Sequence, residues 1–387
     1  MNAPSLVDLS PLWQVLLVGA LLAAAVLCWV WRGHQPRSQS DWLRVLTLLT
    51  LFFTFDLVLF GAFTRLTDSG LGCPDWPGCY GSASPVGAQA AIHAAQSTLP
   101  SGPVTHGKAW VEMVHRYMAT GVGGLILVLA ITSWRRWAAA GTGKGLEPWW
   151  PTLTLVWVCI QGAFGALTVT MKLFPAIVTL HLLGGLMLLV LLCVQAEGLV
   201  RRQRGGARVL IDPVTRIVLL AACGLLGVQV ALGGWVSTNY AVLACSDFPM
   251  CQNSWWPEMH FNLGFQLWRE LGMTQDGAHI TFAALTAIHF VHRLMAVAVL
   301  LALGLLAVRL HAFAGLRLQA RWVAALALMQ LATGLGNVVL GWPLAAALMH
   351  TGGAAALVLV LTWTVAASRV GARVVRVSGL ARMDLSA

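Results

Sequence analysis

The stretch Glu112-Met113-Val114-His115-Arg116 heads an apolar run that continues to Ser133. Glu112 and His115 are three residues apart, so on a helix their side chains share one face, about a turn from each other. Ionisable side chains at the point where a helix enters a membrane are energetically unfavourable, and their presence indicates a functional site. The stretch therefore predicts a membrane-spanning helix over about 113–133 with a polar site near its start.

Three other histidines lie early in apolar runs, as His115 does: His181, His292 and His350. At a rise of about 1.5 Å per residue, all four are expected roughly a third of the way into the membrane from one side. The four histidines form two matched pairs along the chain, and the other sequence features are arranged around them.

The composition is that of a polytopic membrane protein. Of the 387 residues, 58% are hydrophobic and only 10% are charged, which is far from the composition of a soluble domain. Of the 24 Lys and Arg residues, 18 fall in five segments that alternate with segments carrying few: 32–44, 134–149, 200–216, 309–321 and 369–382. The net charge of +10 therefore reflects the positive-inside rule and excludes a nucleic-acid partner.

Apolar runs of spanning length predict nine helices, at about 11–31, 43–63, 113–133, 150–171, 176–198, 215–236, 283–308, 321–341 and 344–366. With the basic loops inside, the chain is expected to be a multi-pass membrane protein with its N-terminus outside and its C-terminus in the cytoplasm. We interpret the first run as a retained helix, and a cleaved signal segment is the alternative. Segment 84–108, rich in Ala, Ser, Gly and Pro, predicts a mobile outer loop.

The chain contains an internal repeat. Residues 61–79 (GAFTRLTDSGLGCPDWPGC) and 233–251 (GGWVSTNYAVLACSDFPMC) both end in Cys-x-Asp-aromatic-Pro-x-Cys, at an offset of 172 positions. This repeat predicts an all-α fold of two pseudo-symmetric four-helix bundles in parallel orientation, plus one extra N-terminal helix. The expected units are an N-terminal helix with a basic linker (1–42), an N-terminal bundle (43–199), a basic cytoplasmic linker (200–213), a C-terminal bundle (214–367) and a basic cytoplasmic tail (368–387).

Two histidines that face each other across a four-helix bundle are a typical axial ligand pair for haem iron. We expect His115 to pair with His181, and His292 to pair with His350. Zinc is disfavoured, because no cysteine or carboxylate cluster lies at ligand spacing beside them. For any single histidine, a hydrogen-bonded structural role is the alternative.

The polar neighbours of these histidines differ between the two halves. Glu112 has His289 as its counterpart in the second half. A buried carboxyl one turn from an iron ligand can serve as acid, base or charge stabiliser during oxidation, which makes the first half the expected reacting site. His289 has two open roles, as a further iron ligand or in capping and loop contacts. Arg116 and Arg293 suit either haem propionates or lipid headgroups.

Two cysteine pairs with identical spacing, Cys73/Cys79 and Cys245/Cys251, fall in the expected outer loops. In an oxidising compartment each pair is expected to form a disulfide around a small loop. Redox-active thiols that exchange electrons or guide substrate are the alternative.

Taken together, these motifs resemble the haem A synthase family. The resemblance rests on residues 61–71 followed by Cys73-Pro74-Asp75-Trp76-Pro77, on Glu112-x-x-His115-Arg116, and on the motifs around the other three histidines, and it spans about residues 43–366. It implies an oxidoreductase that converts the C8 methyl group of haem O to the formyl group of haem A by successive hydroxylations. The product serves haem-copper terminal oxidases, so the chain would act in cytochrome oxidase assembly.

The resemblance also implies residue roles and partners. His115 and His181 would frame the substrate haem O, Glu112 would be the catalytic carboxylate, and His292 and His350 would ligate a haem b cofactor. The implied partners are a haem O synthase, which would supply the substrate, and the surrounding membrane lipid. The extra N-terminal helix departs from the family's eight-helix arrangement, and the oligomeric state stays open. Two other classes remain: a non-enzymatic di-haem b electron carrier, and a parallel-repeat transporter with a histidine proton relay.

Overall fold

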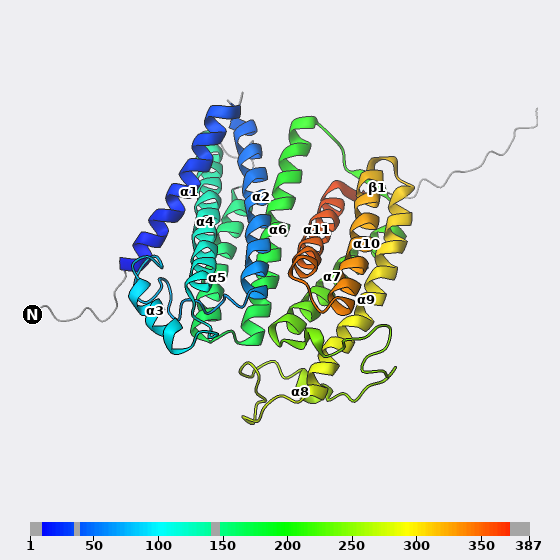
Figure 1. Ribbon diagram of the computed structural model, residues 1–387. Helices are drawn as coiled ribbons and strands as arrows, with labels where there is room; N and C mark the ends of the chain where they lie inside the picture. The colour runs from blue at the N-terminus through cyan, green and yellow to red at the C-terminus, as the bar shows by residue number, and fades with distance from the viewer. Residues whose placement is uncertain (1–9, 35–38, 141–147, 372–387) are drawn as a thin grey trace, which may run out of the picture.

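The computed structural model describes residues 10–34, 39–140 and 148–371. Within these ranges, nine helices are long and apolar enough to cross a membrane, and all nine predicted spans are confirmed (Figure 1). They are α1 (Ser10–His34), α2 (Gln39–Leu66), α4 (His106–Ala140), α5 (Trp149–Thr170), α6 (Pro175–Arg204), α7 (Pro213–Thr238), α9 (Phe282–His311), α10 (Arg317–Val339) and α11 (Leu344–Ala367). The protein is an all-α polytopic membrane protein.

The spanning helices pack in two groups. Helices α2, α4, α5 and α6 contact one another in a ring, and so do α7, α9, α10 and α11. The groups meet where α6 packs on α7 and α11, and where α11 also packs on α2. The predicted pseudo-symmetry between the halves, and the domain boundaries drawn from it, stay predictions.

The extra N-terminal helix α1 packs along α4, as Figure 1 shows. The two helices approach closely at Gly19, where an added Cβ would overlap the side chain of Thr120. Such close approach at small residues is the usual way in which membrane helices associate, because van der Waals contact and not water exclusion drives their packing. Helix α1 therefore lies against α4, outside the ring formed by α2, α4, α5 and α6.

Local sequence signals set several helix ends. Asp212 caps α7, where its side chain accepts a hydrogen bond from the Thr215 N–H over 3.0 Å and Pro213 takes the first helical position. Thr281 caps α9 in the same way, accepting from the Ala284 N–H. Helix α6 ends at Gly205, whose φ of 60° is the left-handed conformation that glycine adopts without strain.

The segment predicted as a mobile loop, 84–108, contains a helix, α3 (Gln89–Thr98), and the first turn of α4. Ile92 of α3 is fully buried, and it packs in one cluster with Cys73, Cys79 and Met113. The loop prediction was wrong because composition alone did not reveal that this apolar face is buried against the first cysteine loop.

Five short elements were also not foreseen: η1 (Ala241–Leu243), α8 (Phe261–Gly264), η2 (Ala314–Leu316), and the two strands of a parallel sheet, β1 (Val209–Ile211) and β2 (Ser368–Val370). Leu210 pairs with Arg369 in the sheet. The sheet joins the entry to α7 with the exit from α11, at the end of the helices opposite α3 and α8 (Figure 1). It therefore ties the two ends of the second group together.

Candidate functional site

In the first group, each predicted ligand histidine lies with its ring against a glycine of a neighbouring helix. A Cβ added to Gly61 of α2 would lie 3.0 Å from Cε1 of His115 on α4. A Cβ added to Gly165 of α5 would lie 3.5 Å from Cε1 of His181 on α6. The glycines thus leave the space that the imidazoles occupy.

The second group repeats this arrangement. A Cβ added to Gly233 of α7 would lie 3.1 Å from Cε1 of His292 on α9, and one added to Gly334 of α10 would lie 3.3 Å from Cε1 of His350 on α11. A Cβ contact near 3 Å is tighter than side chains normally tolerate, so larger residues at these positions would displace the rings.

The histidines are close to one another within each group. His115 and His181 lie near enough for a charge on one to act on the other, and the same holds for His292 and His350. Each expected pair thus belongs to one ring of helices, and the binding of one iron by both imidazoles stays a prediction. Their rings are partly buried, and in the first group Phe60 stacks nearly parallel to the His115 ring, at 6.3 Å between centroids.

The ring nitrogens of the first pair have no protein partner. Among the described residues, neither nitrogen of His115 or His181 takes part in a hydrogen bond, and both Nδ1 atoms are enclosed. Nδ1 of His292 is also enclosed and unpartnered, whereas Nδ1 of His350 lies 2.9 Å from Oγ1 of Thr333. Buried polar atoms without partners are unfavourable, so these imidazoles fit positions that a bound ligand completes.

The side chains present limit which kind of metal group each histidine pair could bind. In the part of the chain that the structure describes, no three or more His, Cys, Asp or Glu side chains gather where they could hold a metal ion. Two imidazoles are a donor set that would suit an iron already held by a porphyrin, because such an iron needs few ligands from the protein. The residues present therefore fit haem.

Glu112 lies one helical turn before His115 on α4 and is only 4% exposed. Its Oε2 accepts a hydrogen bond from the Cys73 N–H over 2.8 Å, and its Oε1 forms an ion pair with Arg116. This carboxylate is thus held between a disulfide loop and an arginine of its own helix.

The arginines that follow His115 and His292 contact the cysteine loops. Nη1 of Arg116 donates to the carbonyl oxygens of Asp75 and Pro77, over 3.0 and 3.2 Å, and of Gly78. The sequence predicted haem propionates or lipid headgroups as partners of this guanidinium. The structure places its Nη1 against backbone carbonyls of the first cysteine loop, which folds back over the start of α4. A role toward propionates or headgroups stays a prediction.

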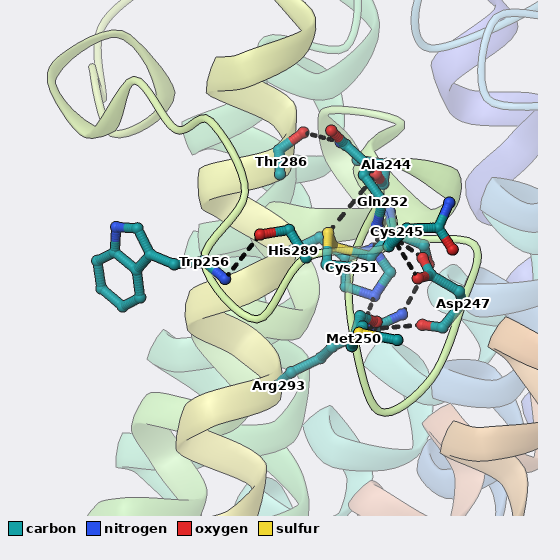
Figure 2. The surroundings of a disulfide bond; sticks show 12 residues. Ala244, Cys245, Asp247, Met250, Cys251, Gln252, Trp256, Thr286, His289 and Arg293 are labelled. Atoms are coloured by element: carbon teal, nitrogen blue, oxygen red, sulfur yellow. Dashed lines mark hydrogen bonds between the residues drawn. A yellow bond between two sulfur atoms is a disulfide. The ribbon is translucent and has the colours of Figure 1, made fainter.

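The second group has the same arrangement, shown in Figure 2. Arg293 donates to the carbonyl oxygens of Asp247, Met250 and Cys245, over 2.8, 3.0 and 2.7 Å. Nδ1 of His289 lies 3.4 Å from the Cys245 N–H nitrogen, and its Nε2 lies 3.3 Å from Nε of Arg293. His289 therefore takes the place of Glu112 and makes the loop contact that was one of its two predicted roles.

The exchange of carboxylate for imidazole changes the chemistry of this position. A carboxylate accepts hydrogen bonds at both oxygens, whereas a neutral imidazole has one acceptor nitrogen. Glu112 therefore satisfies both of its donors, while His289 can accept from only one of its two neighbours at a time. At this position the first group has a carboxyl group beside its histidine pair, whereas the second group has an imidazole.

Both predicted disulfides, Cys73–Cys79 and Cys245–Cys251, are present. Inside each loop, an aspartate side chain accepts two backbone N–H groups that follow the second cysteine. Asp75 accepts from Tyr80 and Gly81, over 2.6 and 2.7 Å. The aspartate of the repeated Cys-x-Asp motif thus shapes the loop, a role that the sequence interpretation missed.

Asp247 plays the same part in the second loop. It accepts from the N–H groups of Gln252 and Asn253, over 2.7 and 2.9 Å. The backbone N–H of Asn253, together with that of Gln252, holds the pKa of Asp247 below its ordinary value, although some desolvation opposes this shift.

Sequence reasoning also missed a cluster that joins the two groups. Arg65 at the end of α2 pairs with Asp68 over 3.1 Å and stacks over the Tyr240 ring at 4.1 Å. The Tyr240 hydroxyl donates to Asp68 over 2.7 Å, and Arg65 donates to the Ser237 carbonyl oxygen. The pairs 65/237 and 68/240 are separated by 172 positions, the offset of the sequence repeat, and that signal could have revealed the contact.

Comparison with known proteins places the chain among related sequences. The model of the COX15-CtaA family, described as cytochrome oxidase assembly protein, matches residues 44–362. A protein of Shewanella oneidensis named "Heme A synthase" is 36% identical over 323 residues, which cover 84% of this chain and 94% of the relative. A "Heme A synthase" of Caulobacter vibrioides is 28% identical over 360 residues, covering 86% of this chain and 96% of the relative.

Proposed function

This chain belongs to the COX15-CtaA family of cytochrome oxidase assembly proteins, and from that premise we propose that it is a haem A synthase. In this proposal the chain is an oxidoreductase that converts a methyl group of haem O to the formyl group of haem A. Two relatives that align over almost their full length carry the name "Heme A synthase", which supports the assignment.

The observation that carries the proposal is the unequal pair of histidine sites. Both have imidazoles backed by glycines, but only the His115/His181 site has a buried carboxylate, Glu112, one turn away. We assign haem O to this site. The His292/His350 site, with His289 in the place of the carboxylate, would hold haem b as cofactor.

The residues of the first site divide the work between them. His115 and His181 would fix the substrate by its iron, so that its ring edge lies at a constant distance from α4. Oxidation of a methyl group removes electrons and protons together, and Glu112 would accept a proton at a carboxylate oxygen or balance positive charge at the reacting carbon. Arg116 would keep Glu112 in place. When bound, haem b supplies reversible one-electron chemistry.

The location and orientation of the protein in the membrane are inferred from the positions of its basic segments. We place the protein in a bacterial inner membrane with the cysteine loops on the periplasmic side, because the basic segments 200–216 and 309–321 lie at the other end of the helices. Residues 43–199 would form the substrate half and residues 214–367 the haem b half. A haem O synthase would deliver the substrate, and haem-copper oxidases would receive the product.

The test is to produce the chain in a bacterium that makes haem O but has no haem A synthase of its own. Haems are then extracted and separated by chromatography. We expect haem A to appear together with a b-type absorption spectrum of the purified protein. Haem O alone, with the b-type spectrum intact, would instead indicate a di-haem electron carrier, and a colourless protein would indicate a transporter.

A further inference from the structure

A second candidate site lies at the end of the helices opposite the cysteine loops. A cavity of about 370 Å³ opens there between α6, α7, α11 and the two-stranded sheet. Four arginines line it: Arg201, Arg208, Arg216 and Arg369. The remaining lining residues are apolar apart from Ser368. The cavity thus combines a cluster of positive charge with a wall of the kind that contacts hydrocarbon.

No carboxylate lines this cavity, and among the described residues none of its arginines forms an ion pair. The two acidic residues nearest in sequence are engaged elsewhere. Glu197 accepts from Nε1 of Trp363 over 3.2 Å, and Asp212 pairs with Arg309 over 3.2 Å. Within the described ranges, neither acid forms an ion pair with an arginine of the cavity.

The fold fixes part of the cluster and leaves part of it free. Nη1 of Arg201 donates to the Ala366 carbonyl oxygen over 3.0 Å, and Nη1 of Arg216 donates to that of Val365 over 3.4 Å. Each guanidinium has five N–H donors, so both keep donors for a ligand. The side chains of Arg208 and Arg369 are exposed and form no hydrogen bond within the described ranges.

We propose that this cavity binds the phosphate headgroup of an anionic phospholipid of the cytoplasmic leaflet. Guanidinium groups match phosphate oxygens in geometry as well as charge, and basic pockets between membrane helices on the cytoplasmic side suit such headgroups. The apolar wall, including Val194 of α6 and Val365 of α11, offers a surface for the acyl chains. This site is independent of the haem chemistry.

The chain's own C-terminal segment is a poor alternative occupant. Residues 372–387 carry Arg373, Arg376 and Arg382 but only one acidic side chain, Asp384. A segment with this balance carries a net positive charge, so its side chains are not a source of anions for the arginines. The missing negative charge is therefore expected from outside the chain.

Native mass spectrometry of the purified full-length protein tests the proposal, with phosphatidylglycerol, phosphatidylcholine and inorganic phosphate as probes. The test variant is Arg208→Gln/Arg369→Gln, because these side chains form no hydrogen bond or ion pair within the described ranges. The matched control is Arg317→Gln/Arg321→Gln. It removes two exposed arginines at the start of α10 that do not line the cavity. Should the double variant not fold, Arg369→Gln alone gives the same comparison.

We expect the wild type to bind phosphatidylglycerol in preference to phosphatidylcholine. Binding should weaken about fivefold for each cavity arginine removed, the effect of one basic residue near an anionic membrane, and should be unchanged in the control. Equal weakening in both variants, or no weakening in the cavity variant, would overturn the proposal. Displacement of the lipid by an equal concentration of inorganic phosphate would assign the site to a free anion and would also overturn it.

Discussion

The backbone N–H of Cys73 donates to Oε2 of Glu112 over 2.8 Å. The first disulfide loop and the buried carboxylate of the candidate site are thus in direct contact, and Arg116 holds the other carboxylate oxygen. In the second group the matching contact is made by His289, over a longer distance. The two sites therefore differ at this acid–base position, which holds a carboxyl group in the first and an imidazole in the second.

Replacing Glu112 by Gln tests the importance of that difference. The amide keeps the size and can still accept the Cys73 N–H, but it cannot balance the charge of Arg116 or take up a proton. We expect haem A formation to fall by about 10²-fold or more, while the b-type spectrum remains. Chromatography of extracted haems measures the change, with His289→Gln as control. Wild-type product levels in Glu112→Gln would show that the carboxylate is incidental.

The assignment of haem b to the second group predicts a spectroscopic loss. His292→Ala or His350→Ala removes one axial ligand of the proposed pair, so the low-spin b-type absorption of the purified protein should disappear. His93→Ala, on the exposed face of α3, should leave the spectrum unchanged. An unaltered spectrum in both ligand variants would remove haem from this site.

The glycines in contact with the histidine rings give a prediction that does not require replacing a histidine. In Gly233→Ala the new Cβ would lie 3.1 Å from Cε1 of His292, so the ring must shift. We expect about 1–3 kcal/mol of overpacking destabilisation and a change in the absorption spectrum. Gly227→Ala, on the same helix with no atom within 4 Å of the new Cβ, should be neutral or stabilising. Identical thermal midpoints and spectra for the two variants would contradict this account.

Asp247 predicts a pH dependence of the second cysteine loop. Because hydrogen bonds from Asn253 and Gln252 place its pKa below the ordinary value of 3.8, its contribution to stability is complete above about pH 4. That contribution is lost as the pH falls through the lowered pKa, where the carboxylate becomes protonated.

Thermal unfolding between pH 3 and pH 7 measures this effect. Asp247→Asn should melt below the wild type at pH 7, and the difference should shrink toward the acid end of the range. The control is Asp276→Asn, at an exposed aspartate of the same outer segment that makes no hydrogen bond within the described ranges, and it should match the wild type throughout. A constant difference at every pH would show that Asp247 acts through its shape and not its charge.

Much of this molecule could be predicted from sequence because the bilayer imposes a length and a polarity on each segment. About twenty apolar residues are needed to cross hydrocarbon, so the nine spans were recognisable from the runs alone. The three-residue spacing of Glu112 and His115 placed both on one face of α4 for the same local reason. The disulfide pairs followed from an identical spacing in two outer segments.

The sequence by itself therefore determined the spans, the histidine pairs to be expected and the cysteine loops. Only the tertiary structure decided what the polar groups contact. The partners of Arg116, at Asp75, Pro77 and Gly78, lie about forty residues away in the chain, and no local pattern records that the loop folds back onto α4. The burial of α3 and the pairing of β1 with β2 depend on similar long-range contacts. Periodicity and hydropathy indicate which faces of a segment are exposed to lipid or water. Hydrogen-bond partners that are distant in sequence are set by how the segments pack.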